Sequence, residues 1–230
     1  EMPMVQKLTG DYYADYPIVF TLEQRKTALI IVDLQYASAS RTVGLGKLLT
    51  DEKKDGLGSY RFDRIENVVV PNTQRLLAFF RKHELRVIYL TIGSMMPDYS
   101  DIGIHKRAFT KAKNNRFGQR EHEILDELKP RPGELVINKT TPSAFNSSNI
   151  DSALRSMGVE YCLFCGVSTH MCVEGTARDA SERGYHCTIV EDACGANKPE
   201  FHNNALLVWQ RGFGKVRAVD EVIGELQENL

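Results

Sequence analysis

Short and almost continuous apolar segments recur along the chain, and most of the intervals between them have helical periodicity. The apolar segments are rich in β-branched residues and run over 28–34, 86–92, 134–139, 161–167, 186–192 and 215–220. Strands with such an unbroken apolar pattern are usually covered on both faces, as in a parallel sheet. The pattern therefore predicts a six-stranded, mostly parallel sheet.

Helical patterns occupy the intervals 64–84, 149–158, 169–184 and 199–212. The last three each end at a glycine, which is a common helix stop, and the last begins at a proline, which is favoured in a first turn. Alternation of strands and helices with short links is typical of a doubly wound α/β fold with right-handed crossovers. We therefore expect a three-layer α/β sandwich, formed by a single domain over residues 1–230.

Two segments fit neither pattern. Residues 37–62 hold four glycines and show little periodicity, and residues 93–120 are polar and basic. Each segment follows the carboxyl end of a predicted strand, where open α/β sheets place the loops that contact ligands. We expect both to be loop insertions that form the pocket and reach toward a partner subunit.

The charge and hydropathy of the chain exclude several classes of partner. The formal net charge is −1 and the pI is about 6.7, so the chain as a whole does not attract nucleic acid or an anionic membrane. No apolar run approaches the roughly 20 residues that a membrane-spanning helix needs. The first twenty residues lack a basic segment followed by an apolar one, so we expect no signal peptide.

The five cysteines, at positions 162, 165, 172, 187 and 194, are odd in number and concentrated in one third of the chain. Such a set is a poor disulfide framework for a chain of this length. It indicates a reducing compartment, and we expect the protein in the cytoplasm. Cys162 and Cys165 lie inside a predicted strand and are interpreted as core residues.

Polar side chains stand where three of the predicted strands end. Asp33 ends the first strand, Lys139 ends the third, and Cys172 follows the fourth, close to the start of a helix. The carboxyl ends of parallel strands share one edge of the sheet, so these groups are expected to converge on one site. A cysteine is nucleophilic as its thiolate, which Lys139 and a helix N-terminus would both favour.

The same residues provide the remaining parts of a covalent mechanism. Asp33 can accept the thiol proton and later deliver it to a leaving amine. Backbone N–H groups at Ser168 and Cys172 would stabilise a tetrahedral oxyanion. Gly166 would let the chain turn out of the strand before the thiol.

Several neighbouring residues are candidates for contact with the substrate. Gln35 and Tyr36 follow Asp33 closely, and Asn197 lies at another strand end, where it could bind a carboxylate. Phe145 is either a substrate contact or a wall of the pocket.

Longer segments of the chain resemble the isochorismatase-like cysteine hydrolases. They are "TALIIVDLQ", "GELVINKTTPSAF", "LRSMGVEYCLFCGVSTHMCVEGTARDASERGYHCTIVEDACGA" and the "FG" of "QRGFGKV", and they span about 27 to 220. This family includes nicotinamidases, N-carbamoylsarcosine amidohydrolases, ureidoacrylate amidohydrolases and biuret hydrolases.

The resemblance implies roles for particular residues. Asp33 would be the general acid and base, Lys139 the cation and Cys172 the nucleophile. A non-proline cis peptide bond between Val167 and Ser168 would aim the amides of Ser168 and Cys172 at the oxyanion. By resemblance to the biuret hydrolases, Gln210 could contact a substrate amide. The family's habit of assembly implies a homodimer or homotetramer.

Departures from the family pattern restrict the range of expected substrates. Nicotinamidases carry an Asp/His metal motif after the second strand, but this chain has "LTIGSMMPDYSDIG" there and no histidine before His105. We therefore expect no metal and no cofactor. The isochorismatases proper lack the catalytic cysteine, so Cys172 argues against vinyl-ether hydrolysis. Ser38 stands where many members have an aromatic residue over the substrate, which changes the shape of the pocket.

The sequence thus predicts a metal-independent cysteine amidohydrolase. Its substrate would be a small carbamoyl compound, ureide or amide, cleaved at a C–N bond through a thioester-type covalent intermediate. A nicotinamidase-like or maleamate-like amidase is an alternative that uses the same residues. A non-catalytic α/β protein with a redox-sensitive Cys172 is an alternative of another class.

Overall fold

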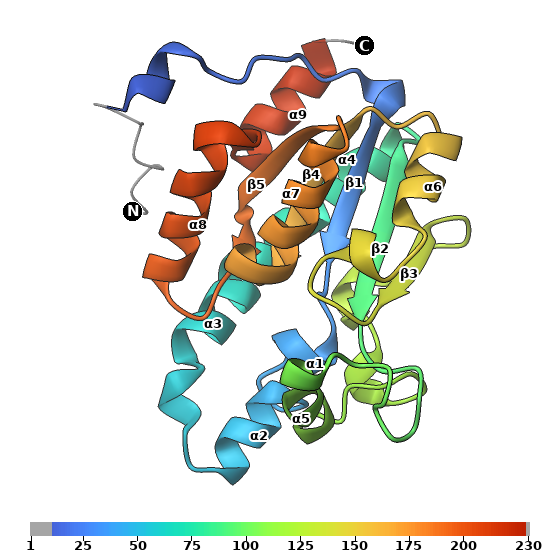
Figure 1. Ribbon diagram of the computed structural model, residues 1–230, viewed down its shortest axis with the longest axis vertical. Helices are drawn as coiled ribbons and strands as arrows, with labels where there is room; N and C mark the ends of the chain where they lie inside the picture. The colour runs from blue at the N-terminus through green and yellow to red at the C-terminus, as the bar shows by residue number, and fades with distance from the viewer. Residues whose placement is uncertain (1–10, 229–230) are drawn as a thin grey trace.

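Six parallel strands form one sheet in the order β3-β2-β1-β4-β5-β6 (Figure 1). The structure is a computed structural model that describes residues 11–228. The strands are β1 (Thr27–Val32), β2 (Arg86–Ile92), β3 (Leu135–Lys139), β4 (Tyr161–Val167), β5 (His186–Gly195) and β6 (Lys215–Arg217). Every neighbouring pair is parallel, which confirms the predicted sheet.

Helices cover both faces of the sheet and complete the three layers. Helices α4 (Val70–Lys82) and α9 (Val219–Glu228) lie on one face, and α6 (Ile150–Ser156), α7 (Glu174–Glu182) and α8 (Pro199–Gly212) lie on the other (Figure 1). In α4 the buried side chains recur at helical spacing, at Thr73, Leu76, Leu77, Phe79 and Phe80. The central strands β1 and β4 are buried along their whole length, as their apolar sequences predicted.

The helix expected over 64–84 is part of a longer helical segment. It begins with α3 (Ser59–Arg64), passes through a π-helical turn, η4 (Ile65–Val69), and continues as α4. The π-turn ends two residues before Pro71, which has no N–H to donate to a regular helix. The helix α9 was not predicted, because the sequence pattern extended the last strand to residue 220, whereas β6 ends at Arg217.

The two insertions contain more regular structure than the sequence predicted. The segment 37–62 includes most of α1 (Tyr36–Ala39), α2 (Leu45–Asp51) and the start of α3, and the segment 93–120 contains α5 (Ile104–Ala112). These helices are short, so their periodicity is weak in the sequence. The remaining short helical turns are η1 (Tyr12–Asp15), η2 (Gln24–Lys26), η3 (Asp55–Leu57), η5 (Arg120–His122), η6 (Asp126–Leu128), η7 (Ala144–Asn146) and η8 (Thr169–Val173).

The strand order fixes where a ligand can bind. The chain leaves β1 toward β2 and β3 on one side and later returns to β4, β5 and β6 on the other, so the order reverses between β1 and β4. In doubly wound sheets a crevice forms at this point, outside the carboxyl ends of the strands. Helices α1, α2 and α5 lie beyond that edge (Figure 1). Within residues 11–228 the structure contains no helix that could span a membrane.

Candidate functional site

A buried ion pair joins the ends of two strands. Asp33 directly follows β1 and has a φ of 53°, an uncommon conformation for a residue other than glycine. Lys139 is the last residue of β3, and its Nζ donates a 2.8 Å hydrogen bond to Oδ2 of Asp33. The two side chains are 0% and 2% exposed. The other carboxylate oxygen of Asp33, Oδ1, is also buried and has no hydrogen-bond partner among the described residues.

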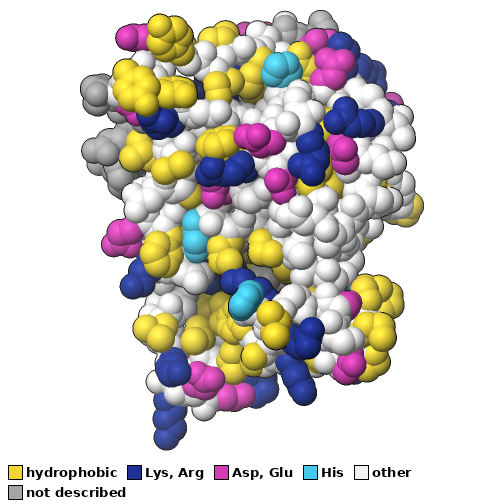
Figure 2. All heavy atoms as spheres, viewed as in Figure 1, with side chains coloured by type: hydrophobic (Ala, Val, Ile, Leu, Met, Phe, Trp, Pro, Cys, Tyr) yellow, Lys and Arg dark blue, Asp and Glu magenta, His cyan; other side chains and the backbone are white. Residues whose placement is uncertain are grey.

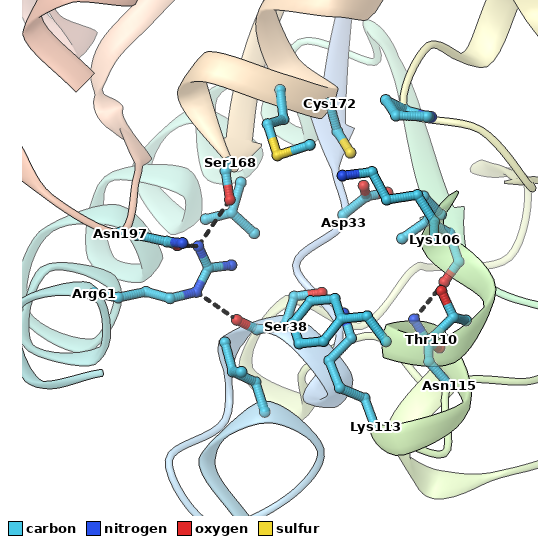
Figure 3. A pocket seen from close by; sticks show the side chains of 16 residues that line it. Asp33, Ser38, Arg61, Lys106, Thr110, Lys113, Asn115, Ser168, Cys172 and Asn197 are labelled. Atoms are coloured by element: carbon cyan, nitrogen blue, oxygen red, sulfur yellow. Dashed lines mark hydrogen bonds between the residues drawn. The ribbon is translucent and has the colours of Figure 1, made fainter. Parts of the chain in front are cut away.

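Cys172 joins this pair from the turn that follows β4. It lies in the π-helical turn η8, which Ser168 precedes and which continues into α7. The peptide bond between Val167 and Ser168 is cis. Cys172 and Asp33 line the same cavity, and Figure 3 shows their side chains turned toward one another. The structure therefore brings together the acid, the cation and the thiol that the sequence placed at three strand ends.

The electrostatics of the thiol differ from the expectation that it would be readily ionised. Burial raises the pKa of Cys172 to about 12, Lys139 acts to lower it, and the charge of Asp33 raises it further. Burial also disfavours the ammonium of Lys139, but the charges of Asp33 and Cys172 outweigh this effect, and the pKa of Lys139 lies above its ordinary value. Burial therefore favours the neutral thiol form of Cys172. Its proton has to leave during the reaction, and Asp33 is the adjacent acceptor.

Gly166 has a different role from the one expected of it. It is the penultimate residue of β4 rather than part of a turn, with a φ of 116°, and it pairs in register with Val32 of β1. A Cβ at this position would collide with the carbonyl oxygen of Val32. Glycine therefore permits the close approach of β1 and β4, and this approach places Asp33 beside the turn that carries Cys172.

Both insertions contribute side chains to a cavity of about 150 Å³ around Cys172. Arg61 comes from the first insertion, and Lys106 and Lys113 come from the second (Figure 3). On the face shown in Figure 2, the surface is hollowed between the sandwich and the helices beyond the strand ends, and basic side chains lie at the hollow. The sequence predicted that these segments form the pocket, but it did not single out these three cations.

Arg61 is held by three elements that are distant in the sequence. Its Nε donates to the carbonyl oxygen of Ser38 at 2.9 Å. Its Nη1 donates to Oγ of Ser168 and to Oδ1 of Asn197, both at 2.8 Å. Burial lowers the pKa of Arg61 to about 10, so it stays positively charged at neutral pH. Asn197, a predicted substrate contact, lines the cavity and also fixes this arginine.

Gln35 and Tyr36, two other predicted contacts, do not line the cavity with Cys172. The Gln35 side chain is buried, donates to the carbonyl oxygen of His122 at 2.7 Å and accepts from the N–H of Ile92 at 2.8 Å. The ring of Tyr36 packs 3.8 Å from the guanidinium carbon of Arg120. Both residues lie close to Asp33 in the sequence, but their side chains pack against the segment near residue 122.

Phe145 and Gln210 also lie elsewhere. The Phe145 ring packs against Tyr185 and the guanidinium of Arg183, so it belongs to the wall between η7 and α7. Gln210 lines a separate cavity, together with residues near the N-terminal end of the described chain such as Tyr13. The helix α8 starts at the carboxyl edge of the sheet and runs back along it, so its last turn lies at the opposite edge. The expected contact between Gln210 and the substrate is therefore not supported by its position.

Among residues 11–228, no three His, Cys, Asp or Glu side chains come together in a way that could hold a metal ion. Within the same range all five cysteines are free thiols. Cys162 and Cys165 are buried in β4, as predicted for core residues.

Comparison with known proteins places this geometry in a family. Residues 27–221 match the isochorismatase domain. The ureidoacrylate amidohydrolase RutB of Caulobacter segnis is 43% identical over 201 residues, which cover 81% of this chain and 79% of that protein. RutB of Agrobacterium fabrum is 28% identical over 228 residues, covering 92% and 95%.

Solved structures share the fold of this chain. A cysteine hydrolase from Pseudomonas syringae pv. phaseolicola superposes with a TM-score of 0.77 at 24% identity, covering 93% of this chain and 98% of that one. N-carbamoylsarcosine amidase from Thermoplasma acidophilum superposes with a TM-score of 0.63 at 25% identity, covering 85% and 97%. The chain therefore belongs to the isochorismatase-like cysteine hydrolases.

Proposed function

We propose that this protein is a cysteine amidohydrolase that cleaves a C–N bond of a small ureide. The observation that carries the proposal is the meeting of Cys172 with the buried Asp33–Lys139 pair at the switch point of the sheet. The chain is a hydrolase that acts on carbon–nitrogen bonds other than peptide bonds, like its amidohydrolase relatives. The names of these relatives, which act on ureidoacrylate and N-carbamoylsarcosine, favour a carbamoyl compound over a simple amide.

The reaction begins with transfer of the Cys172 proton to Asp33. The sulfur then attacks the carbamoyl carbon, and the negative charge that develops on the carbonyl oxygen is stabilised by the amides of Ser168 and Cys172. As the tetrahedral intermediate collapses, Asp33 returns its proton to the leaving amine or ammonia, and an S-carbamoyl thioester remains on Cys172. Water, deprotonated by Asp33, hydrolyses this intermediate and restores the thiol.

Lys139 acts throughout as a fixed positive charge. Its hydrogen bond to Oδ2 leaves Oδ1 of Asp33 as the oxygen that is free to exchange a proton. Its charge also opposes the effect of burial on the pKa of Cys172, so it lowers the cost of the transient thiolate. Every step is assigned to side chains and amides of this chain, so we propose that the enzyme works without a metal or a cofactor.

We also propose that the protein works in the cytoplasm as a homodimer or homotetramer. The free thiols of residues 11–228 suit a reducing compartment. The proposed assembly is based on the homo-oligomers that members of the family usually form. Sedimentation at micromolar concentration tests it. A species larger than the 26.0 kDa monomer is expected.

A panel of ureides and amides, scored by the release of ammonia or amine, tests the proposed function. The wild type should hydrolyse at least one ureide faster than nicotinamide and maleamate, and Cys172→Ala should hydrolyse none. Preference for nicotinamide or maleamate would replace the ureide proposal with the alternative amidase. A wild type that is inactive on the whole panel, and so has no activity for alkylation of Cys172 to remove, would favour the non-catalytic alternative.

A further inference from the structure

Arg61 is a buried cation that pairs with no carboxylate in the described part of the chain. It is 4% exposed, and none of the ion pairs among residues 11–228 includes it. Its hydrogen bonds go to a carbonyl, a hydroxyl and an amide oxygen, all of them neutral. A buried charge is normally paired, because its removal from water is costly. The site thus keeps a positive charge that its own side chains do not neutralise.

The hydrogen-bonding capacity of this guanidinium is only partly used. Nε and Nη1 donate to the protein, but no hydrogen bond from Nη2 occurs within the described part of the chain. Figure 3 shows two nitrogens of Arg61 with hydrogen bonds and the third turned into the cavity. The three bonds fix the plane of the group, so the free edge is oriented before any ligand arrives.

Lys113 adds a second charge near Arg61. Its ammonium lies 4.5 Å from the ring centroid of Phe109, and no ion pair in residues 11–228 includes it. Arg61 and Lys113 line the same cavity. Burial and then the charge of Arg61 lower the pKa of Lys113 to about 8. The carboxylate that lines the same cavity belongs to Asp33, and Lys139 already holds one of its oxygens.

The cavity therefore has two chemically different ends. Cys172 and Asp33 lie at one end, and the side chain of Lys106 reaches toward them (Figure 3). Arg61 and Lys113 lie across the open space from that end. At about 150 Å³, the cavity suits a small molecule whose two ends are only a few bonds apart. A substrate with its carbamoyl carbon at the thiol has its other end among the cations.

We propose that Arg61, assisted by Lys113, binds a carboxylate on the substrate and selects ureido acids over neutral ureides. The carboxylate accepts a hydrogen bond from Nη2 of Arg61, and Lys113 supplies a second positive charge. Because Arg61 also holds Ser168, the anion is positioned relative to the turn that carries Cys172. This inference rests on the proposed function and assigns a specificity residue to it.

Two substrates of equal length test the assignment. 3-Ureidoacrylate carries the carboxylate, and its methyl ester lacks the charge but keeps the ureide. We expect the wild type to favour the acid in kcat/KM. Arg61→Met should lower kcat/KM for the acid on the order of 10²- to 10³-fold, because one partner of a buried ionic contact is lost, and should lower it only a few-fold for the ester. Arg41→Met is the matched control, since Arg41 lies in the same insertion but pairs at the surface with Asp63 and Glu66.

The opposite result is an equal loss for the two substrates. If the ratio of kcat/KM for the acid to kcat/KM for the ester stays at its wild-type value in Arg61→Met, Arg61 serves only to hold Ser38, Ser168 and Asn197 in place. If Arg61→Met does not fold, Lys113→Met provides the same comparison through KM.

A binding measurement separates this inference from the proposed chemistry. Calorimetry of the Cys172→Ala variant with 3-ureidopropionate measures binding without turnover. We expect this variant to bind the ligand and the double variant with Arg61→Met not to bind it. If the wild type releases no ammonia but this binding pattern holds, the chemistry is wrong and the carboxylate site stands. Equal affinity for 3-ureidopropionate and its methyl ester would overturn the carboxylate site.

Discussion

Lys139 crosses the end of β2 to reach Asp33, and its Nζ lies 2.8 Å from Oδ2 of that carboxylate. The pair joins strands that are not neighbours in the sheet and is fully shielded from solvent. It holds one carboxylate oxygen and leaves Oδ1 of Asp33, the residue that faces Cys172, without a hydrogen-bond partner among residues 11–228. In the proposed proton transfers, Oδ2 accepts the hydrogen bond from Lys139 and Oδ1 exchanges the proton.

Asp33→Asn tests the proton acceptor. The amide keeps the shape of the side chain but cannot take the Cys172 proton, and burial has raised the pKa of that thiol to about 12. Loss of a general base commonly lowers the rate by a factor of about 10² to 10⁴. Single-turnover rates with a ureide should fall within this range. A variant that keeps wild-type kcat would assign the base to another group.

Lys139→Met tests the stabilising role of the cation. The substitution leaves the carboxylate of Asp33 buried and unpaired, which typically costs about 3–5 kcal/mol. Urea unfolding should show a decrease of this size in the free energy of unfolding. Adding Asp33→Asn should restore part of the loss, because the buried charge is then removed. If the double variant is less stable than Lys139→Met alone, the buried charge is not the cause.

The pH dependence of KM tests the role of Lys113. Its pKa is lowered to about 8, so the side chain is charged below that pH and neutral above it. Arg61, with a pKa of about 10, stays charged through the same range. KM for a ureido acid should therefore rise as the pH increases through about 8, and KM for the methyl ester should not. In Lys113→Met this rise should be absent, and its persistence would show that another group titrates.

Gly166→Ala tests the close contact between the two central strands. The new methyl group would meet the carbonyl oxygen of Val32, and the φ of 116° is unfavourable for alanine. Gly158 also has a positive φ, of 67°, but open space around it, so Gly158→Ala isolates the effect of backbone conformation. We expect Gly166→Ala to lower the melting temperature more than Gly158→Ala does. Equal shifts would show that the strands can separate without cost.

The sequence was sufficient for the sheet and for the convergence of Asp33, Lys139 and Cys172. Unbroken apolar strands imply parallel pairing, and parallel pairing brings the strand ends to one edge. Arg61 could not be found in this way, because its position depends on contacts with Ser38, Ser168 and Asn197, which are up to 136 positions away.

The errors at single residues have similar causes. Gln210 was placed near the substrate by resemblance, but the direction of α8 puts its last turn at the far edge of the sheet. The ionisation of Cys172 was inferred from the charge of Lys139 and from a helix N-terminus. The larger effect is removal from water, which depends on packing around the thiol that a linear sequence does not display.

Mass spectrometry of the protein trapped with a slowly hydrolysed ureide tests most directly whether Cys172 forms a covalent intermediate. We expect a carbamoyl adduct on the peptide that contains Cys172 in the wild type, little of it in Asp33→Asn, and none in Cys172→Ala. A Cys172→Ala variant that turns the ureide over at the wild-type rate would show that the hydrolysis does not use Cys172 as the nucleophile.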